Sequence, residues 1–421
     1  MTRRPRTTDS IFAIHLPIVN TAFVLTAIFA AMILSAPAAQ AQTVTVLHSF
    51  TSHADGSTPV AGVTLDRAGN FYGTTNGVES DSPSTVYKMT HAAGGWILST
   101  LYTFSHPNDP SQVDAPVVIG PDGALYGTSY SGGQFNLGSV FSLRPPATVC
   151  KSVSCPWTLT TLHDFDGLDG THPGNGNLVF DAAGNIYGTT SAGGGHSRGT
   201  VFKLTRSGGS WTESVLYSFT GGDDGATPMG GVASDNAGNL YGTTNAGGAN
   251  SHGTVYELSP YGGGWADTTL YTFTDGDDGG NPIGGVAIDA QGDLYGTTSV
   301  ALAGHGAGTV WELVPSNGNW TFTLLHSFSG PAYPGPSATP TLDTDGNVYG
   351  TSTYTGRGSG FGEVFKLTPG DGGWTYTAYE FDGVDLRNPE CSVAVDANGN
   401  LYGTTILGGT ENWGAVWEIT P

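Results

Sequence analysis

The 421-residue sequence is poor in charged residues, and above all in basic ones. Only 11% of its residues are charged, less than half of the roughly 25% usual in globular proteins. Against 35 Asp and Glu there are 13 Lys and Arg, which gives a formal net charge of −22. Phosphate binding depends on clustered Lys and Arg. We therefore expect no nucleic-acid partner, and an acidic chain of this kind is also unsuited to anionic membrane surfaces.

Long apolar runs are missing except near the N-terminus. Residues 21–34 are apolar, follow three Arg residues, and precede the small-residue pattern Ala39-Gln-Ala41. This arrangement predicts a signal peptide over residues 1–41, because the run is shorter than the about 20 residues that a membrane span needs. We expect a secreted protein, extracellular or periplasmic, with no membrane span after cleavage. The mature chain, residues 42–421, is expected to form a single domain.

The motifs of common enzymes are missing as well. The sequence contains no G-x-S-x-G, H-E-x-x-H, P-loop or dinucleotide-binding fingerprint. Glycine, by contrast, is abundant at 66 residues, and 11% of the residues are aromatic. This composition argues against disorder and is typical of many short strands joined by tight turns.

One sequence unit recurs seven times with a period of about 54 residues. The string Tyr-Gly-Thr begins at Tyr72, Tyr126, Tyr187, Tyr241, Tyr295, Tyr349 and Tyr402. A Phe ends a short apolar run at Phe50, Phe104, Phe165, Phe219, Phe273, Phe328 and Phe381. Both markers keep the same register, so the repeat covers the whole mature chain.

Each unit predicts four short strands. Around Tyr241 we expect strands at 231–234, 239–244, 254–258 and 265–273, with a tight turn after the first. Helical periodicity is missing throughout, so the predicted fold class is all-β. Seven units of four strands predict a seven-bladed β-propeller of four-stranded blades. An open solenoid of seven units is the alternative.

The two ends of the mature chain complement each other. Residues 44–50 match the fourth strand of a unit, whereas residues 415–420 match the third strand of the last unit, which has no fourth strand of its own. We expect the N-terminal strand to complete the last blade and so close the ring. Closure of this kind would remove two exposed strand edges.

The repeat, with elements such as GTVFKL, LYSF and GNLYGTT, resembles the tandem repeat of exported bacterial proteins named GloVer after Gloeobacter and Verrucomicrobia. The resemblance extends over residues 44–421 and is specific because its motifs recur seven times. It implies export and a repeat architecture. It implies no activity, cofactor or substrate.

An Asp-x-x-Gly segment follows the first strand of most units and is open to two interpretations. These segments begin at Asp66, Asp181, Asp235, Asp289, Asp343 and Asp396, and the second unit has Gly120 instead. They would serve as hairpin turns in which the carboxylate accepts backbone N–H groups. A calcium loop of the EF-hand type would need further oxygen ligands and a Glu at position twelve, and Leu or Val follows instead. We favour the turn.

A second acidic loop joins the fourth strand to the next unit, and a His-containing loop joins the second and third strands. In a propeller meander both loops emerge on one face, which is a surface suited to binding. The candidate ligand-binding residues are Asp166, Asp169, Asp223, Asp224, Asp275, Asp277, Asp278, Asp382, Asp385, His196, His252 and His305. No cofactor is required by any motif, and calcium is the ion that oxygen-rich loops would take. The alternative is that these acids form turns and solvate the surface.

Three further residue types, Trp, Tyr and Cys, have structural interpretations. Six Trp residues open the fourth strands and are expected to pack between blades rather than stack on sugars: Trp96, Trp157, Trp211, Trp265, Trp320 and Trp374. The Tyr of Tyr-Gly-Thr is expected to pack there too, with the Gly letting backbones approach. Cys150 and Cys155 are predicted to form a disulfide in the longest unit, and Cys391 is predicted to be buried and unpaired.

Two functional hypotheses remain open. The first is an exported, non-enzymatic, monomeric repeat protein that presents a propeller face to an extracellular protein or polysaccharide. The second is an extracellular carbohydrate-active hydrolase or lyase that uses carboxylates on that face. Near-identical units favour the first hypothesis, because an active site normally makes one or two units differ. Neither catalytic residues nor metal ligands can be named from the spacing.

Overall fold

The computed structural model describes residues 42–77, 82–146, 157–174, 176–300, 308–328, 335–354 and 360–421. Thr43–Thr420 form one compact unit. Across the described ranges the regular structure is entirely β, and no helix there could cross a membrane. The predicted signal peptide, residues 1–41, lies outside the described residues.

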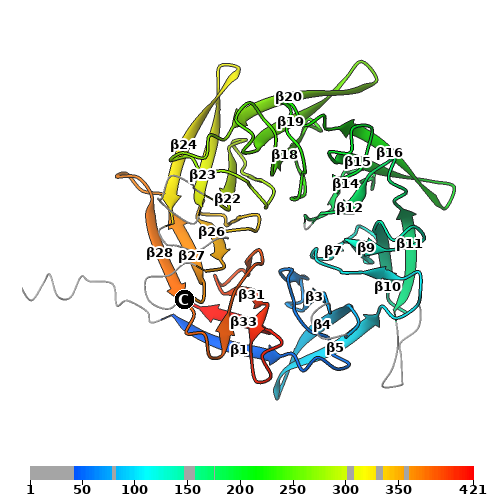
Figure 1. Ribbon diagram of the computed structural model, residues 1–421. Helices are drawn as coiled ribbons and strands as arrows, with labels where there is room; N and C mark the ends of the chain where they lie inside the picture. The colour runs from blue at the N-terminus through cyan, green and yellow to red at the C-terminus, as the bar shows by residue number, and fades with distance from the viewer. Residues whose placement is uncertain are drawn as a thin grey trace, which may run out of the picture. The chain divides into compact units, whose positions relative to one another are not determined.

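Seven antiparallel four-stranded sheets follow one another around a ring, which confirms the seven-bladed β-propeller (Figure 1). Blade 1 comprises β2 (Thr64–Leu65), β3 (Phe71–Thr75), β4 (Thr85–Ala92) and β5 (Gly95–Thr103). Blade 2 comprises β7 (Val118–Ile119), β8 (Leu125–Ser129), β10 (Ser139–Arg144) and β11 (Thr158–Asp164). Blade 3 comprises β13 (Val179–Phe180), β14 (Ile186–Ala192), β15 (Thr200–Ser207) and β16 (Ser210–Ser218). Blade 4 comprises β17 (Ala233–Ser234), β18 (Leu240–Thr244), β19 (Thr254–Tyr261) and β20 (Gly264–Thr272).

The remaining blades repeat this order. Blade 5 comprises β21 (Ala287–Ile288), β22 (Leu294–Thr298), β23 (Thr309–Ser316) and β24 (Asn319–Ser327). Blade 6 comprises β25 (Thr341–Leu342), β26 (Val348–Ser352), β27 (Glu363–Thr368) and β28 (Thr375–Glu380). Blade 7 comprises β30 (Ala394–Val395), β31 (Leu401–Thr405), β33 (Ala415–Thr420) and β1 (Thr43–Ser49). Short accessory strands lie in the loops: β6 (Pro110–Ser111) with β9 (Ser131–Gly132), β12 (Thr171–Pro173) on β14, and β29 (Leu386–Arg387) with β32 (Leu407–Gly408).

The ring closes as the sequence predicts. β1 pairs antiparallel with β33, from Thr43 opposite Thr420 to Ser49 opposite Ala415. The register shifts once, between Val46 and His48. The N-terminal strand is therefore the outermost strand of blade 7, and an open solenoid is wrong.

The Asp-x-x-Gly segments are hairpin turns. In blade 4, Oδ1 of Asp235 accepts hydrogen bonds from the backbone N–H groups of Ala237 (2.8 Å) and Asn239 (2.9 Å). Its Oδ2 accepts from the Asn239 amide (2.8 Å) and the Tyr241 hydroxyl (3.2 Å). Both carboxylate oxygens thus accept hydrogen bonds within the turn, as the turn interpretation predicts.

The inner strands are shorter than expected. The sequence predicts a strand at 231–234, but β17 contains only Ala233 and Ser234. The preceding residues bond to the neighbouring blade instead, because the Gly230 carbonyl accepts a hydrogen bond from Thr189 of blade 3 (2.8 Å). The equivalent bond forms at five other contacts between blades, the last from Thr404 to the Ala61 carbonyl (2.9 Å). In blade 2 the corresponding hydroxyl, that of Thr128, has no partner among the described residues.

The Tyr and Gly of each Tyr-Gly-Thr fill the space between strands and blades. Tyr241 packs edge-on against Trp320 of the next blade, with ring centroids 6.1 Å apart. The expected packing role of the fourth-strand Trp is therefore correct in this blade. The Gly acts differently from our expectation: a Cβ on Gly242 would overlap the ring of Tyr256 on the adjacent strand. The glycine makes room for an aromatic side chain, not for a neighbouring backbone.

Candidate ligand-binding site

In six of the seven units the entry to the inner strand places a side chain at the wall of the central channel, and in the third unit the corresponding residue is Gly174. A proline fixes the backbone immediately before this residue in six of the seven units. We use the term "channel residue" for the residue at this position in each unit. The seven channel residues are Val60, Asp114, Gly174, Met229, Ile283, Ser337 and Glu390. The chemistry at this position changes from unit to unit, unlike that of the recurring Tyr-Gly-Thr.

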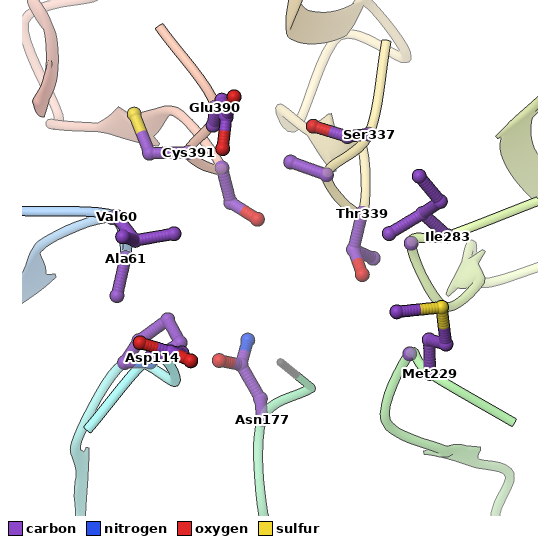
Figure 2. Close-up of a pocket in the computed structure, with 16 residues that line it drawn as sticks. Val60, Ala61, Asp114, Asn177, Met229, Ile283, Ser337, Thr339, Glu390 and Cys391 are labelled. Atoms are coloured by element: carbon purple, nitrogen blue, oxygen red, sulfur yellow. The ribbon is translucent and has the colours of Figure 1, made fainter. Parts of the chain in front are cut away.

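A cavity of about 170 Å³ lies among these residues. Six of the seven channel residues line it, and the third unit contributes Asn177 (Figure 2). Asp114 and Asn177 lie next to each other, and Met229 and Ile283 lie together elsewhere on the wall (Figure 2). The cavity therefore has a polar and an apolar portion, although the blades that form it are built alike.

Asp114 has unusual electrostatics. The side-chain amide of Asn76, on the preceding unit, donates a hydrogen bond to its Oδ1. Burial raises the pKa of Asp114 to about 7 against the effect of that hydrogen bond, and the charge of Glu390 raises it further. At neutral pH this carboxyl is present in both protonation states, so it can donate as well as accept a hydrogen bond.

The loops predicted to share a face do lie together. The backbone N–H of Gly194, between the second and third strands, donates to the Gly167 carbonyl in the acidic loop (3.1 Å). Gly248 and Gly222 make the equivalent bond in the next unit (2.8 Å).

Several of the predicted binding acids close their own loops. Asp224 accepts hydrogen bonds from the backbone N–H (2.7 Å) and the hydroxyl (2.5 Å) of Thr220. Although partial burial opposes them, these bonds and one from Tyr217 hold the pKa of Asp224 below its usual value. Asp278 repeats the arrangement with Thr274.

The acids of other loops act similarly. Asp166 accepts a hydrogen bond from the Leu168 N–H (2.8 Å), and Asp382 accepts from the N–H groups of Val384 (2.9 Å) and Asp385 (3.3 Å). Such bonds give these acids a structural role in their own loops.

The remaining predicted residues are dispersed. Asp275 is buried, and its carboxylate lies 3.8 Å from the Nδ1 of His252. Asp223, Asp277 and His196 are exposed, and His305 lies outside the described residues. Binding of calcium or a sugar by this face stays a prediction.

Asp169 is the one predicted acid that belongs to a set of close metal-ligating groups within the described ranges. It does so together with His163 and Glu213, neither of which the sequence analysis selected.

One of the three predicted roles for cysteines can be compared with the structure. Cys391 is free and buried, as predicted, and its Sγ lies within hydrogen-bond distance of the Thr404 backbone. Burial raises the pKa of this thiol. Cys150 and Cys155 lie outside the described residues, so their disulfide stays a prediction.

Sequence reasoning missed the cavity residues Asp114, Asn177 and Glu390. A usable signal was present: when the units are aligned on the proline that six of them contain, the residue at the following position is apolar, a glycine, a hydroxyl or a carboxylate. The sequence prediction used residues that recur in all units, whereas residues that differ among the units line the cavity.

The fold and the cavity define a seven-bladed propeller repeat protein with a small pocket in its channel. The chain belongs to the Gloeobacter/Verrucomicrobia repeat family, whose model matches residues 37–236 and 200–417. The resemblance found in the sequence is thereby confirmed. No curated protein matches the chain.

Solved structures share the architecture at low sequence identity. A provisionally named 6-phosphogluconolactonase from Bacteroides uniformis has a TM-score of 0.51 and 15% identity, covering 79% of this chain and 88% of that one. A provisionally named glucose dehydrogenase from Thermus thermophilus has a TM-score of 0.44 and 15% identity, covering 73% of this chain and 96% of that one. The first likeness supports the propeller fold alone, and the second is too distant to add to it.

Proposed function

We propose that the protein is a non-enzymatic glycan-binding propeller whose channel cavity holds the end of a saccharide chain. The observation that carries this proposal is the divergence of the channel residues among otherwise similar units. A position that served only packing would be expected to repeat like the Tyr, Gly and Thr beside it.

The size of the cavity favours a small group. At about 170 Å³ it is smaller than the roughly 300–1,000 Å³ typical of sites for drug-sized ligands. A single terminal sugar is the size of ligand that such a site would accept, with the rest of a longer chain outside it.

The chemistry of the wall favours hydroxyl groups over a cation. Because Asp114 is partly protonated near neutral pH, it can exchange donor and acceptor roles with a hydroxyl. Glu390 and Asn177 offer further acceptors and a donor. Met229 and Ile283 offer apolar contact suited to the C–H face of a sugar ring.

Glycan-array binding of the mature protein, followed by calorimetric titration, tests this function. We expect saturable binding without turnover, and at least tenfold weaker binding in Asp114→Asn and Glu390→Gln. The matched control is Asp345→Asn, an exposed acid in a hairpin turn, which should bind normally. Equal affinity in all three variants would show that the cavity is not the binding site.

A hydrolase or lyase is the second candidate. The observation that favours it is that Asp114, whose pKa is raised, lines the same cavity as a second carboxylate, that of Glu390. A pair of carboxyl groups in one site can supply the general acid and the general base of a hydrolytic reaction. Release of product from a polysaccharide panel, lost in Asp114→Asn, would establish this function in place of simple binding.

We also propose that the protein is exported, with its partner outside the cytoplasm. The support is the signal-like sequence of residues 1–41. Mass spectrometry of the protein from its native host should then show an N-terminus at Gln42. A chain that retains residues 1–41 would contradict export by this route.

A further inference from the structure

We propose that His163, Asp169 and Glu213 form a binding site for one first-row transition-metal dication, of which Zn²⁺ is the representative. The site lies between blades 2 and 3, away from the channel cavity, and is independent of the proposed glycan binding. Its three ligand atoms lie within 4.8 Å of one another.

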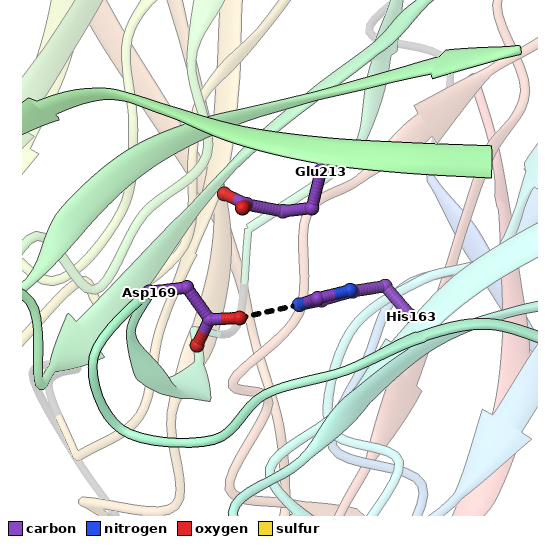
Figure 3. A group of neighbouring side chains, drawn as sticks. All are labelled: His163, Asp169 and Glu213. Atoms are coloured by element: carbon purple, nitrogen blue, oxygen red, sulfur yellow. Dashed lines mark hydrogen bonds and ion pairs between the residues drawn. The ribbon is translucent and has the colours of Figure 1, made fainter.

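The three side chains come from three segments (Figure 3). His163 lies on β11, Asp169 on the loop after it, and Glu213 on β16 of the next blade. The Nε2 of His163 lies 2.7 Å from the Oδ2 of Asp169. The other oxygen of Asp169 accepts a hydrogen bond from the Asp166 N–H (3.0 Å), which fixes the orientation of the carboxylate. Tetrahedral zinc holds its N and O ligands about 3.4 Å apart, so small side-chain rotations would suffice.

The environment of the Glu213 carboxylate favours a bound cation. Its Oε1 is shielded from solvent and has no hydrogen-bond partner among the described residues. Burial raises the pKa of Glu213 to about 7, and the charges of Asp169 and Asp166 raise it further. A buried oxygen without a partner destabilises the fold, and a cation between the carboxylates would satisfy it.

The other units show that Glu213 departs from the repeat. Each fourth strand places one residue opposite an apolar residue of the third strand, as Glu213 lies opposite Leu204. In five blades that residue is Leu98, Leu159, Phe322, Tyr376 or Val44, and in blade 4 it is Asp267. An acid is therefore not needed to build this strand.

In the apolar examples this residue covers the ring of the preceding blade that corresponds to His163. Phe322 stacks on Tyr271 at 4.5 Å, and Tyr376 stacks on His326 at 3.8 Å between ring centroids. Glu213 brings a carboxylate to the place where these aromatic rings lie. The imidazole thereby meets a second acid in addition to Asp169.

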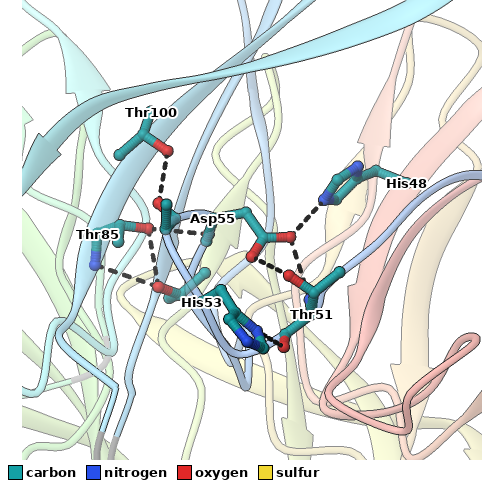
Figure 4. A network of polar contacts seen from close by, with 8 residues as sticks. His48, Thr51, His53, Asp55, Thr85 and Thr100 are labelled. Carbon is teal, nitrogen blue, oxygen red and sulfur yellow. Dashed lines mark hydrogen bonds and ion pairs between the residues drawn. The ribbon is translucent and has the colours of Figure 1, made fainter.

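The contact between blades 7 and 1 is the matched natural comparison (Figure 4). His48 Nε2 lies 3.1 Å from Asp55 Oδ2, and Asp55 accepts two hydrogen bonds from Thr51. This pair reproduces His163 and Asp169, but the third position is Leu98. Only the contact between blades 2 and 3 combines an imidazole with two carboxylates at these equivalent, described positions.

The ligand set selects the class of metal. Carboxylates alone would suit calcium or magnesium, whereas an imidazole nitrogen favours zinc and its neighbours in the first transition row. Three protein ligands leave a further position for water. The proposed ion would therefore be bound by one nitrogen and two carboxylate groups.

Calorimetric titration of chelator-treated mature protein with ZnCl2 tests the proposal, together with melting temperatures in ZnCl2 and in NaCl of equal ionic strength. We expect one ion per chain and a melting temperature several degrees higher. Glu213→Leu and His163→Tyr introduce residues that other units carry at these positions. Each should retain the fold and weaken zinc binding by more than about 100-fold, beyond the usual effect of losing an outer-shell partner.

Two further variants complete the test. Asp267→Leu removes the corresponding acid of blade 4, where Tyr217 replaces the imidazole, and should bind zinc normally. Leu98→Glu supplies the missing acid beside His48 and Asp55 and should add a second zinc ion. Zinc stabilisation that is absent in the wild type, or unchanged in both Glu213→Leu and His163→Tyr, overturns the proposal. A response to CaCl2 but not to ZnCl2 overturns the assigned class of metal.

Discussion

The same sequence unit forms both the contacts between neighbouring blades and the wall of the channel. The residues at the contacts between blades recur from unit to unit, whereas those at the channel wall differ. Between blades, the Tyr, Gly and Thr of Tyr-Gly-Thr recur in all seven units. At the channel wall the same units supply an apolar side chain, a glycine, a hydroxyl or a carboxylate. We therefore expect stability to depend on the residues that repeat, and the proposed glycan binding to depend on those that differ.

The largest expected effect is on the closing contact between blades. Deleting β1, residues 43–49, removes the outer strand of blade 7 and leaves apolar residues of both neighbouring clusters without cover. We expect loss of most of the about 5–15 kcal/mol that stabilises a typical domain. Urea denaturation checks this against a chain that lacks only residues 1–41. A deletion no worse than trimming a loose tail would contradict the role of closure.

A substitution at a repeated glycine should have a smaller but clear effect. Gly242→Ala forces a methyl group against the ring of Tyr256, and overpacking of this kind costs about 1–3 kcal/mol. Gly94→Ala is the control, because a Cβ there meets nothing within 4 Å. Chemical denaturation should separate the two variants, and glycan affinity should be the same in both. Equal stability would show that the aromatic side chain can move aside.

The smallest effect concerns pH. Burial raises the pKa of Asp267 to about 7, and the charge of Asp224 raises it further. The folded state thus holds a proton more tightly than the unfolded state, so this group lowers the stability progressively as pH rises from about 4 to 7. Asp267→Leu should reduce that dependence and raise the melting temperature at pH 8 by a few degrees. Melting curves from pH 4 to 8 check this, and an unchanged pH dependence would contradict it.

The architecture was predictable because its signals are local and repeated. The markers at Tyr72 to Tyr402 set the number of blades, and the match between residues 44–50 and 415–420 revealed the closure. The acidic loops were recognised from composition, and ligand binding by them stays a prediction. Asp224 and Asp278 occur there because a nearby Thr makes them close a turn, which is a role that composition alone does not distinguish from ligand binding.

The two candidate sites were not predictable because each joins residues from different units. Asp114 and Glu390 come from the second and seventh units, and only the ring brings them to one cavity. His163 and Asp169 are six residues apart in the chain, but Glu213 joins them from the next blade through strand register. The residue spacing within a single unit therefore predicts neither of these groupings.

Pairing of β1 with β33 also sets the order in which the molecule can fold. Thr43 and Thr420, which pair at its end, are separated by 377 positions. Closing so long a segment costs more entropy than forming any hairpin within a blade, and contacts of high sequence separation form slowly. The first strand to be synthesised is therefore the last to find its partner. Until it does, the nascent molecule carries two unpaired strand edges that could join those of other copies.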